Sequence, residues 1–112
     1  MKHFVEIRSL NLRDETRDEF HRLFTEQSLP LLKRWNMDVV SNGPSLHDEN
    51  TYYVIRRFDT LAQRDMREDA FYGSDDWRYG PREAMLSLIN SYTDIVLELD
   101  DDAVRALRSA RS

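Results

Sequence analysis

The sequence predicts an α+β domain of the ferredoxin-like class, with the element order β-α-β-β-α-β. Two observations support this class. Four segments alternate or cluster β-branched and aromatic residues as strands do, and the segments between them place apolar residues at helical spacing. Four antiparallel strands with both helices on one face leave the other face of the sheet bare. We therefore expect a second copy of the chain to cover that face, since symmetric dimers dominate soluble oligomers.

The first part of the chain predicts a strand, a bent helix and a second strand. Residues 4–9 alternate Phe, Glu and Arg with Val, Ile and Ser, which is typical of a strand. In residues 13–35 the apolar positions lie on one side of a helix. Pro30 falls inside this pattern, so we expect a kink or a break there. Residues 37–42 form the second predicted strand.

The middle of the chain predicts a polar connection, a third strand and a second helix. The connection covers residues 43–50, and the strand covers residues 52–58. Thr60 and Gln63 have the spacing of a capping box, in which two side chains satisfy free backbone N–H groups at a helix start. We expect this helix to continue to about Phe71.

The last part of the chain predicts short helices and a final strand. Gly73 ends the second helix, and Ser74 followed by two aspartates is a suitable start for another. Residues 82–89 form a further predicted helix after a Gly-Pro interruption. The last strand covers residues 92–99, and a short helix is expected over residues 102–108.

Composition excludes several classes of function and partner, but it does not identify one function. The 112 residues are expected to form a single domain, residues 1–112, with a core of about 3–99 and a C-terminal tail of 100–112. A net charge of −5 and scattered basic residues argue against a nucleic-acid partner. The absence of cysteine excludes disulfides and thiolate chemistry. No apolar stretch approaches the ~18 residues of a membrane span, so we expect a cytoplasmic protein without membrane partners.

Four segments, taken in order, resemble a known family. They are Glu6-Ile7-Arg8-Ser9, Leu29-Pro30-Leu31-Leu32, the run from Arg57 to Arg64, and Asp76-Trp77. Their order and spacing resemble the NIPSNAP-type domain, one branch of the dimeric α+β barrel superfamily. The resemblance covers residues 4 to about 99, and it departs from the family in the 41–51 loop, which is longer and more polar.

The resemblance implies a homodimer whose two sheets close a barrel, with a cavity between each sheet and its own helices. In the wider superfamily such cavities host cofactor-free quinol oxygenation, lactone isomerisation and polyketide cyclisation, and some branches bind haem. NIPSNAP-type domains mostly have no established activity. The implied ligand is a small aromatic or polyketide-like molecule, handled without a cofactor.

Glu6 and Arg8 alternate onto the same face of the first strand. A carboxylate and a guanidinium are costly to bury unpaired. One interpretation is a structural ion pair, with each other or with Arg56 or Arg57. The other interpretation is a ligand-binding pair for an anion or carbonyl, because arginine suits planar oxygen ligands.

Arg56 and Arg57 are adjacent, so one of them must point to the more buried side of the sheet. We expect that residue to be Arg57, which matches the family arginine and shares its face with Tyr53. Tyr53 would then donate a hydrogen bond to a ligand oxygen. The alternative for Tyr53 is a core tyrosine whose hydroxyl meets a backbone carbonyl.

His21 and Trp35 complete the predicted site. His21 lies beside the apolar side of the first helix and has the pKa range of a general base, although a boundary histidine without function is the plainer interpretation. Trp35 could wall an aromatic ligand or simply pack against the sheet. The three histidines have no metal-site spacing, so we expect no metal and no haem.

Two hypotheses follow from these observations. The first is a homodimer that binds a small molecule and transforms it by positioning and proton transfer, with His21 as base, Arg57 and Tyr53 at the reacting oxygen, and Glu6, Arg8 and Trp35 around the ligand. The second is a non-catalytic interaction module. A solvent-connected cavity favours the first hypothesis, whereas a filled interior with Glu6 and the arginines mutually paired favours the second.

Overall fold

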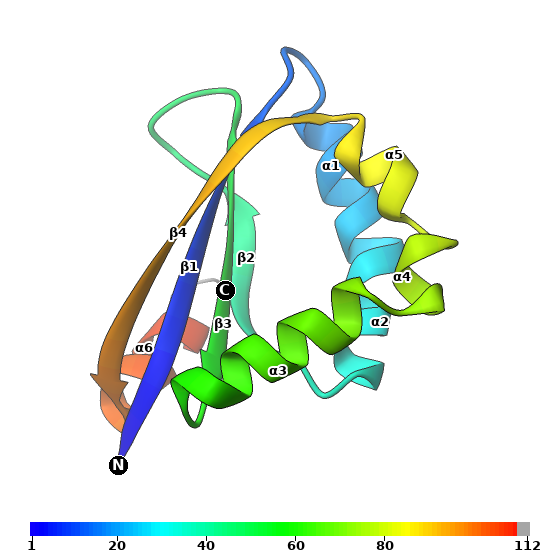
Figure 1. The fold of residues 1–112 in the computed structure, drawn as a ribbon. Coiled ribbons are helices and arrows are strands. Elements are labelled where there is room, and N and C mark those ends of the chain that lie inside the picture. The colour runs from blue at the N-terminus through cyan, green and yellow to red at the C-terminus, as the bar shows by residue number, and fades with distance from the viewer. Residues whose placement is uncertain (110–112) are drawn as a thin grey trace.

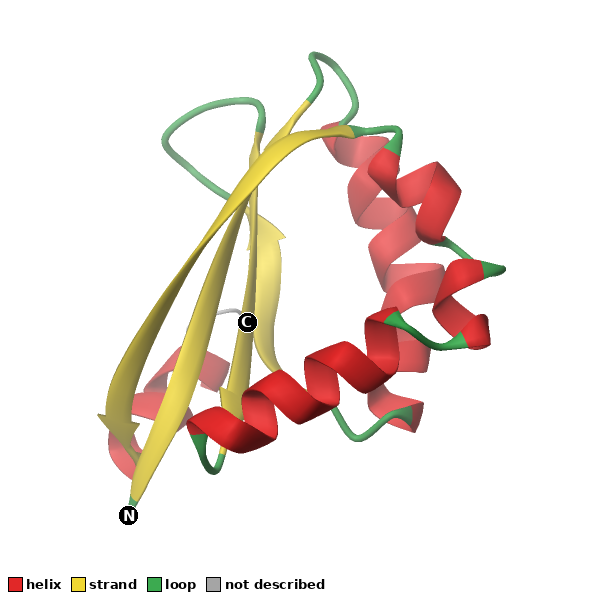
Figure 2. Cartoon of the chain, in the orientation of Figure 1, coloured by secondary structure: helices red, strands yellow, loops and turns green. Residues whose placement is uncertain are grey.

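The computed structural model describes residues 1–109, and their arrangement confirms the predicted α+β fold class (Figures 1 and 2). One antiparallel sheet has the strand order β2-β3-β1-β4, which is the ferredoxin-like order. The strands are β1 (Lys2–Leu12), β2 (Asp38–Pro44), β3 (Thr51–Phe58) and β4 (Ile89–Asp100). Both long strands, β1 and β4, extend beyond the predicted bounds.

The two central strands, β1 and β3, give the sheet two different faces. Even-numbered residues of both strands, such as Leu10 and Val54, point toward the helices and form what we call the cavity face. Odd-numbered residues, such as Val5 and Ile55, point the other way and form the outer face. β4 follows the same alternation, because its register with β1 is regular up to Asn11.

The first helical segment has a π-helical turn in its middle. It consists of α1 (Arg17–Leu23), the π turn η1 (Phe24–Ser28) and α2 (Leu29–Arg34). Pro30 stands in the first turn of α2, where its missing N–H costs least. No break occurs at Pro30, because residues 17–34 are continuously helical; the irregularity is a widened turn that ends two residues before the proline. Asn36, with a φ of 60°, ends the segment in the left-handed conformation.

The second helical segment forms as its capping residues predict. In α3 (Leu61–Tyr72) the Thr60 hydroxyl accepts a hydrogen bond from the backbone N–H of Gln63, at 2.9 Å. The Gln63 side chain in return accepts the backbone N–H of Asp59, one residue earlier than predicted. Ser74 caps α4 (Asp75–Arg78) in the same way, and α5 (Arg82–Leu86) follows. All these helices lie on the cavity face (Figure 1).

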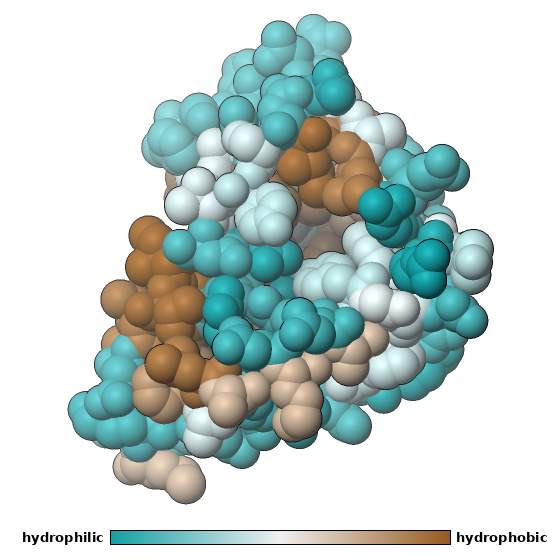
Figure 3. All heavy atoms as spheres, in the orientation of Figure 1, coloured by the Kyte–Doolittle hydropathy of each residue, from teal (hydrophilic) through white to brown (hydrophobic). Residues whose placement is uncertain are grey.

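The outer face is partly covered by the tail, which corrects the expectation of a bare face. The tail forms α6 (Asp101–Ser109), and its Val104 packs against Val5 and Ile55. Over β4, Ile95 and Leu97 stay 56% and 42% exposed. A hydrophobic patch is visible over the β4 side of the molecule in Figure 3.

No helix within residues 1–109 combines the length and apolar character that crossing a membrane requires. Residues 110–112, the end of the predicted tail, lie outside the described part of the chain. The predicted extent of the single domain, residues 1–112, stays a prediction.

Candidate functional site

A cavity of about 570 Å³ lies between the sheet and its own helices. Figure 3 shows the molecule hollowed in this region, between a hydrophobic group and a band of polar atoms. Most of the wall is apolar and comes from the first helical segment, from α3 to α5 and from the sheet. The main apolar residues are Leu10, Phe20, Phe24, Leu32, Val54, Phe71, Trp77, Met85 and Ile89. This volume suits a small organic molecule.

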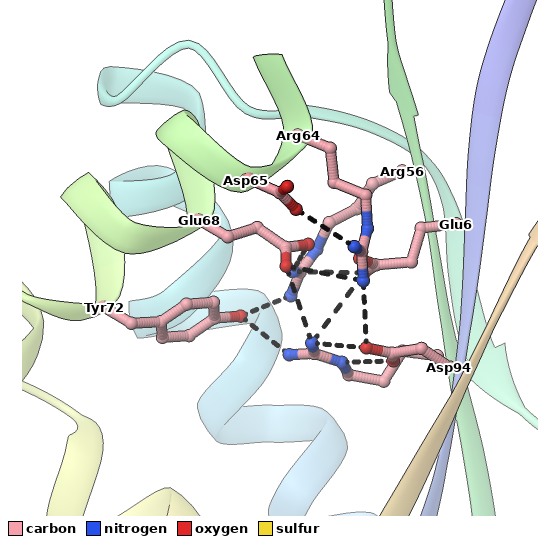
Figure 4. A network of polar contacts seen from close by, with 8 residues as sticks. Glu6, Arg56, Arg64, Asp65, Glu68, Tyr72 and Asp94 are labelled. Atoms are coloured by element: carbon pink, nitrogen blue, oxygen red, sulfur yellow. Dashed lines mark hydrogen bonds and ion pairs between the residues drawn. The ribbon is translucent and has the colours of Figure 1, made fainter. Parts of the chain in front are cut away.

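Arginines from the two central strands and side chains from α3 form a charged part of the cavity wall (Figure 4). Arg8 of β1 makes a two-pronged ion pair with Asp94 of β4, at 2.8 and 3.0 Å. The guanidinium of Arg8 also stacks on the ring of Tyr92, 4.5 Å from its centre. Arg8 is therefore held in one orientation with one side toward the cavity.

Tyr72, at the end of α3, lies between two guanidinium groups. Its hydroxyl oxygen accepts hydrogen bonds from Arg56 at 2.6 Å and from Arg8 at 3.2 Å. The hydroxyl can still donate its own hydrogen, and no acceptor for that hydrogen is found among residues 1–109. Because Tyr72 lines the cavity, this donor is available to a bound molecule.

Glu6 and Glu68 are two carboxyl groups that contact the same arginine, Arg56, and of the two only Glu68 lines the cavity. Glu6 is fully buried; its two oxygens accept from Arg64 at 2.7 Å and from Arg56 at 3.5 Å. Burial, the hydrogen bond to Glu6 and the charge of Glu6 raise the pKa of Glu68 from 4.5 to about 7, against the opposing effect of Arg56 and Arg8. The pKa of Glu6 is lowered: burial opposes this, but the hydrogen bond from Glu68 and both arginines outweigh it.

Two buried polar atoms of the cavity wall have no hydrogen-bond partner within residues 1–109. One is Nε of Arg56, whose residue is 2% exposed, and the other is Oγ of Ser28, also 2% exposed. Ser28 is the last residue of the π turn η1, a kind of turn that often occurs at functional sites. Unsatisfied buried groups are costly, and both atoms are enclosed within the cavity wall rather than facing the hollow.

The structure places Glu6 and Arg8 differently, and their ligand-binding roles stay predictions. Glu6 is a structural partner of Arg56 and Arg64 and does not line the cavity. Arg8 lines it, at 4.0 Å from Glu6. The pair is therefore divided: the carboxylate holds the arginines, and the guanidiniums face the cavity.

The prediction that Arg57 points to the more buried side is wrong. Arg56 is the buried arginine, whereas Arg57 lies on the outer face with Tyr53. The register decides this, because Arg56 stands opposite Glu6 on the cavity face. Tyr53 packs there beside Val5 and Ile55. The catalytic roles predicted for Arg57 and Tyr53 stay predictions, and neither residue lines the cavity.

His21 and Trp35 lie near the cavity without lining it. Nδ1 of His21 is 2.6 Å from the hydroxyl of Tyr52, which also accepts from Asn42 at 2.9 Å. Trp35 packs edge-on against Phe71, and its indole N–H donates to Asp76 at 3.0 Å. Their predicted roles in catalysis and ligand binding are not tested by these contacts.

Sequence reasoning missed Glu68, Tyr72, Asp94 and Ser28. One signal could have found two of them: Arg64, Glu68 and Tyr72 follow one another at intervals of four, so they share one side of α3. That side faces the even-numbered charged residues of the sheet. Within residues 1–109, no three His, Asp or Glu side chains are grouped so that they could hold a metal ion.

Sheet, helices and cavity together define a ferredoxin-like α+β protein with an internal cavity beside a charged network. Among solved structures, a NIPSNAP family protein from Agrobacterium tumefaciens superposes with a TM-score of 0.81 at 15% identity, covering 92% of this chain and 90% of that chain. A NIPSNAP-like domain protein from Burkholderia xenovorans gives 0.81 at 16% identity, covering 88% and 86%.

The fold extends to a further group of proteins. A candidate antibiotic biosynthesis monooxygenase from Nitrosomonas europaea superposes with a TM-score of 0.64 at 7% identity, covering 85% of this chain and 88% of that chain. No protein-family model and no curated protein matches the sequence. The superpositions on the NIPSNAP structures confirm, at the level of the fold, the predicted resemblance to NIPSNAP-type domains.

Proposed function

We propose that this protein binds a small aromatic or polyketide-like molecule in the cavity between its sheet and its helices. The main observation is the pairing of an apolar, partly aromatic wall with a few hydrogen-bonding groups, including the Tyr72 hydroxyl, which has a hydrogen left to donate. Small-molecule sites have this composition. The module hypothesis predicts a filled interior, so the cavity weighs against it, while the pairing of Glu6 with Arg56 and Arg64 agrees with it.

The cavity wall also has the groups that a cofactor-independent proton transfer needs. Glu68 can exchange a proton near neutral pH, since its pKa is raised to about 7 by burial and by Glu6. Arg8 and Arg56 would stabilise negative charge that develops on a ligand oxygen. Oxygenase, isomerase or cyclase-type chemistry on such a ligand is the reaction class we propose, with these residues in place of the more distant Arg57.

Binding can be tested with the fluorescence of Trp77, which lines the cavity. The chain has two tryptophans, so Trp35→Phe leaves Trp77 as the single emitter. The probe is 2-acetylnaphthalene, a neutral aromatic ketone whose absorption overlaps tryptophan emission. We expect saturable quenching in Trp35→Phe. A folded protein whose emission changes only linearly, up to the solubility limit of the probe, would overturn the proposal.

We further propose that a second copy of the chain covers the exposed part of the outer face. Ile95 and Leu97 of β4 form an apolar surface beside α6, and such surfaces are typical of interfaces. Sedimentation of the native chain should give a dimer. The double variant Ile95→Lys, Leu97→Lys should sediment as a folded monomer, while Leu46→Lys, at a loop residue that is 99% exposed, should remain dimeric. A native monomer would refute this part of the proposal.

A further inference from the structure

Apart from the exposed Asp65, the charged network beside the cavity contains equal numbers of positive and negative groups. Its guanidiniums belong to Arg8, Arg56 and Arg64, and its carboxyl groups to Glu6, Glu68 and Asp94. Asp94 is paired with Arg8 at 2.8 Å, and Glu6 with Arg64 at 2.7 Å. Glu68 has only longer ion contacts, the shortest at 3.4 Å to Arg56. Glu68 is therefore the carboxyl group whose charge the network holds least firmly.

The hydrogen-bonding capacity that this network leaves unused beside the cavity is that of donors. The Tyr72 hydroxyl accepts from two arginines and keeps its own hydrogen to donate, whereas Nε of Arg56 has no partner within residues 1–109 but is enclosed by the wall. With the guanidiniums of Arg8 and Arg56 beside it, the Tyr72 hydroxyl fits an oxygen that is negatively charged. A carboxylate provides that charge, whereas a neutral carbonyl does not.

A carboxylate in this position would stand close to Glu68, since Arg56 contacts both the open site and Glu68. Two adjacent anions in a buried place repel each other unless one of them is neutralised. Burial and the nearby charge of Glu6 raise the pKa of Glu68, so this carboxyl group accepts a proton more readily than Glu6 or Asp94. The incoming negative charge can therefore be balanced by a proton held on Glu68.

We infer that the cavity binds an aromatic carboxylate through Arg56 and Tyr72, and that Glu68 takes up one proton from solvent as this anion binds. The inference rests on the proposed small-molecule function and names its ligand class. The net charge of the network changes by one unit on protonation of Glu68, which offsets the single charge of the ligand. Nothing covalent forms, and the proton is the only other species transferred.

The groups that face Glu68 come from every neighbouring element. They are Glu6 and Arg8 of β1, Arg56 of β3, Arg64 of α3 itself and Asp94 of β4 through its arginine partners. Arginines stay charged over the working pH range, and the pKa values of Glu6 and Asp94 are lowered: burial opposes this, but their hydrogen bonds and arginine neighbours outweigh it. Glu68 is thus the group in this network that can supply a pH dependence near neutrality.

The test is titration calorimetry with 2-naphthoate at pH 5.5, 7 and 8.5, in pairs of buffers with different ionisation enthalpies. The buffer dependence gives the number of protons taken up. We expect almost none at pH 5.5 and close to one at pH 8.5, with affinity falling about tenfold per pH unit above pH 7. In Glu68→Gln we expect binding that takes up no proton and hardly changes with pH.

The neutral analogue 2-acetylnaphthalene separates this inference from the proposed function. If the ketone binds and 2-naphthoate does not, the inference fails while the cavity remains a binding site. If 2-naphthoate binds without proton uptake at pH 8.5, or if Glu68→Gln takes up as much proton as the native chain, the role of Glu68 is wrong. If neither compound binds to folded protein, the proposed function itself fails.

Discussion

Arg56 and Arg57 are neighbours in β3, but their side chains lie on opposite faces of the sheet and differ in burial and in partners. On the cavity face Arg56 is 2% exposed, contacts Glu6 and Glu68 at 3.5 and 3.4 Å, and keeps one nitrogen without a partner. On the outer face the side chain of Arg57 is 24% exposed and binds Asp38 and Asp59 at 3.0 and 2.8 Å. The buried arginine is thus the less completely paired of the two.

This difference shows that the two faces satisfy the charge of an arginine in different ways. A charge at the surface needs only a partner, and water completes its hydrogen bonds, so ion pairs there contribute little. A charge in the interior has to be balanced by its neighbours. The cavity face balances its arginines with buried carboxyl groups and leaves the Tyr72 hydroxyl a hydrogen to donate beside the hollow, whereas the outer face pairs Arg57 with carboxylates and His3.

The largest expected effect comes from comparing Arg56→Met with Arg57→Met. Removing Arg56 takes a buried positive charge from Glu6 and a donor from Tyr72, so we expect a loss of about 3 kcal/mol in the free energy of unfolding and loss of ligand binding. Arg57→Met removes partly exposed pairs and should cost about 1 kcal/mol or less. Urea unfolding and the Trp77 quenching titration measure the two quantities.

The same pair of variants tests the predicted catalytic role of Arg57. If Arg57→Met abolished binding while Arg56→Met kept it, the outer face would be the functional one. If both variants kept binding, neither arginine would be a ligand contact, and Arg8 would be the next residue to change.

The next expected effect is on the pH dependence of stability. Burial and the neighbouring Glu6 raise the pKa of Glu68 in the folded state from 4.5 to about 7. Below pH 4.5 both the folded and unfolded states hold this proton; between pH 4.5 and 7 the unfolded chain loses it first. Stability contributed by Glu68 therefore falls as pH rises through this window.

Glu68→Gln should remove that loss, because glutamine resembles the protonated acid. We expect the variant to match the native chain at pH 4 and to be more stable by about 3 kcal/mol at pH 7.5, from urea unfolding at each pH. Carboxyl carbon NMR of the native chain gives an independent measurement. A titration midpoint near 4.5 for Glu68 would contradict the coupling to Glu6.

Much of the fold could be predicted because local signals agreed with the global topology. Thr60 and Gln63 marked the start of α3, and the alternation of β1 placed Glu6 and Arg8 on one face. The bend near Pro30 was visible, but not its π-helical form. Turns of this kind are rare inside α-helices, and the spacing of the apolar residues does not distinguish one from a regular helix.

The site was harder to predict because it depends on register. Choosing between Arg56 and Arg57 required knowing which residue of β3 stands opposite Glu6, and a shift of one residue exchanges the faces. Family resemblance favoured Arg57, yet pairing with a fully buried carboxylate requires Arg56. Asp94 and Glu68 join the same network from separate elements, so only the assembled structure brings them together.

The smallest expected effect on stability comes from comparing a serine on each side of the sheet, with all arginines left unchanged. Ser28 places an unpartnered hydroxyl in the buried cavity wall, while Ser9 lies exposed on the outer face. Ser28→Ala removes an unsatisfied polar atom and favours the helix, so we expect a gain of about 0.5–1 kcal/mol in the free energy of unfolding. Ser9→Ala should change it by less than about 0.5 kcal/mol. A loss of stability in Ser28→Ala would mean that the hydroxyl already has a partner, such as an ordered water, and that the cavity is a satisfied polar site in the absence of ligand.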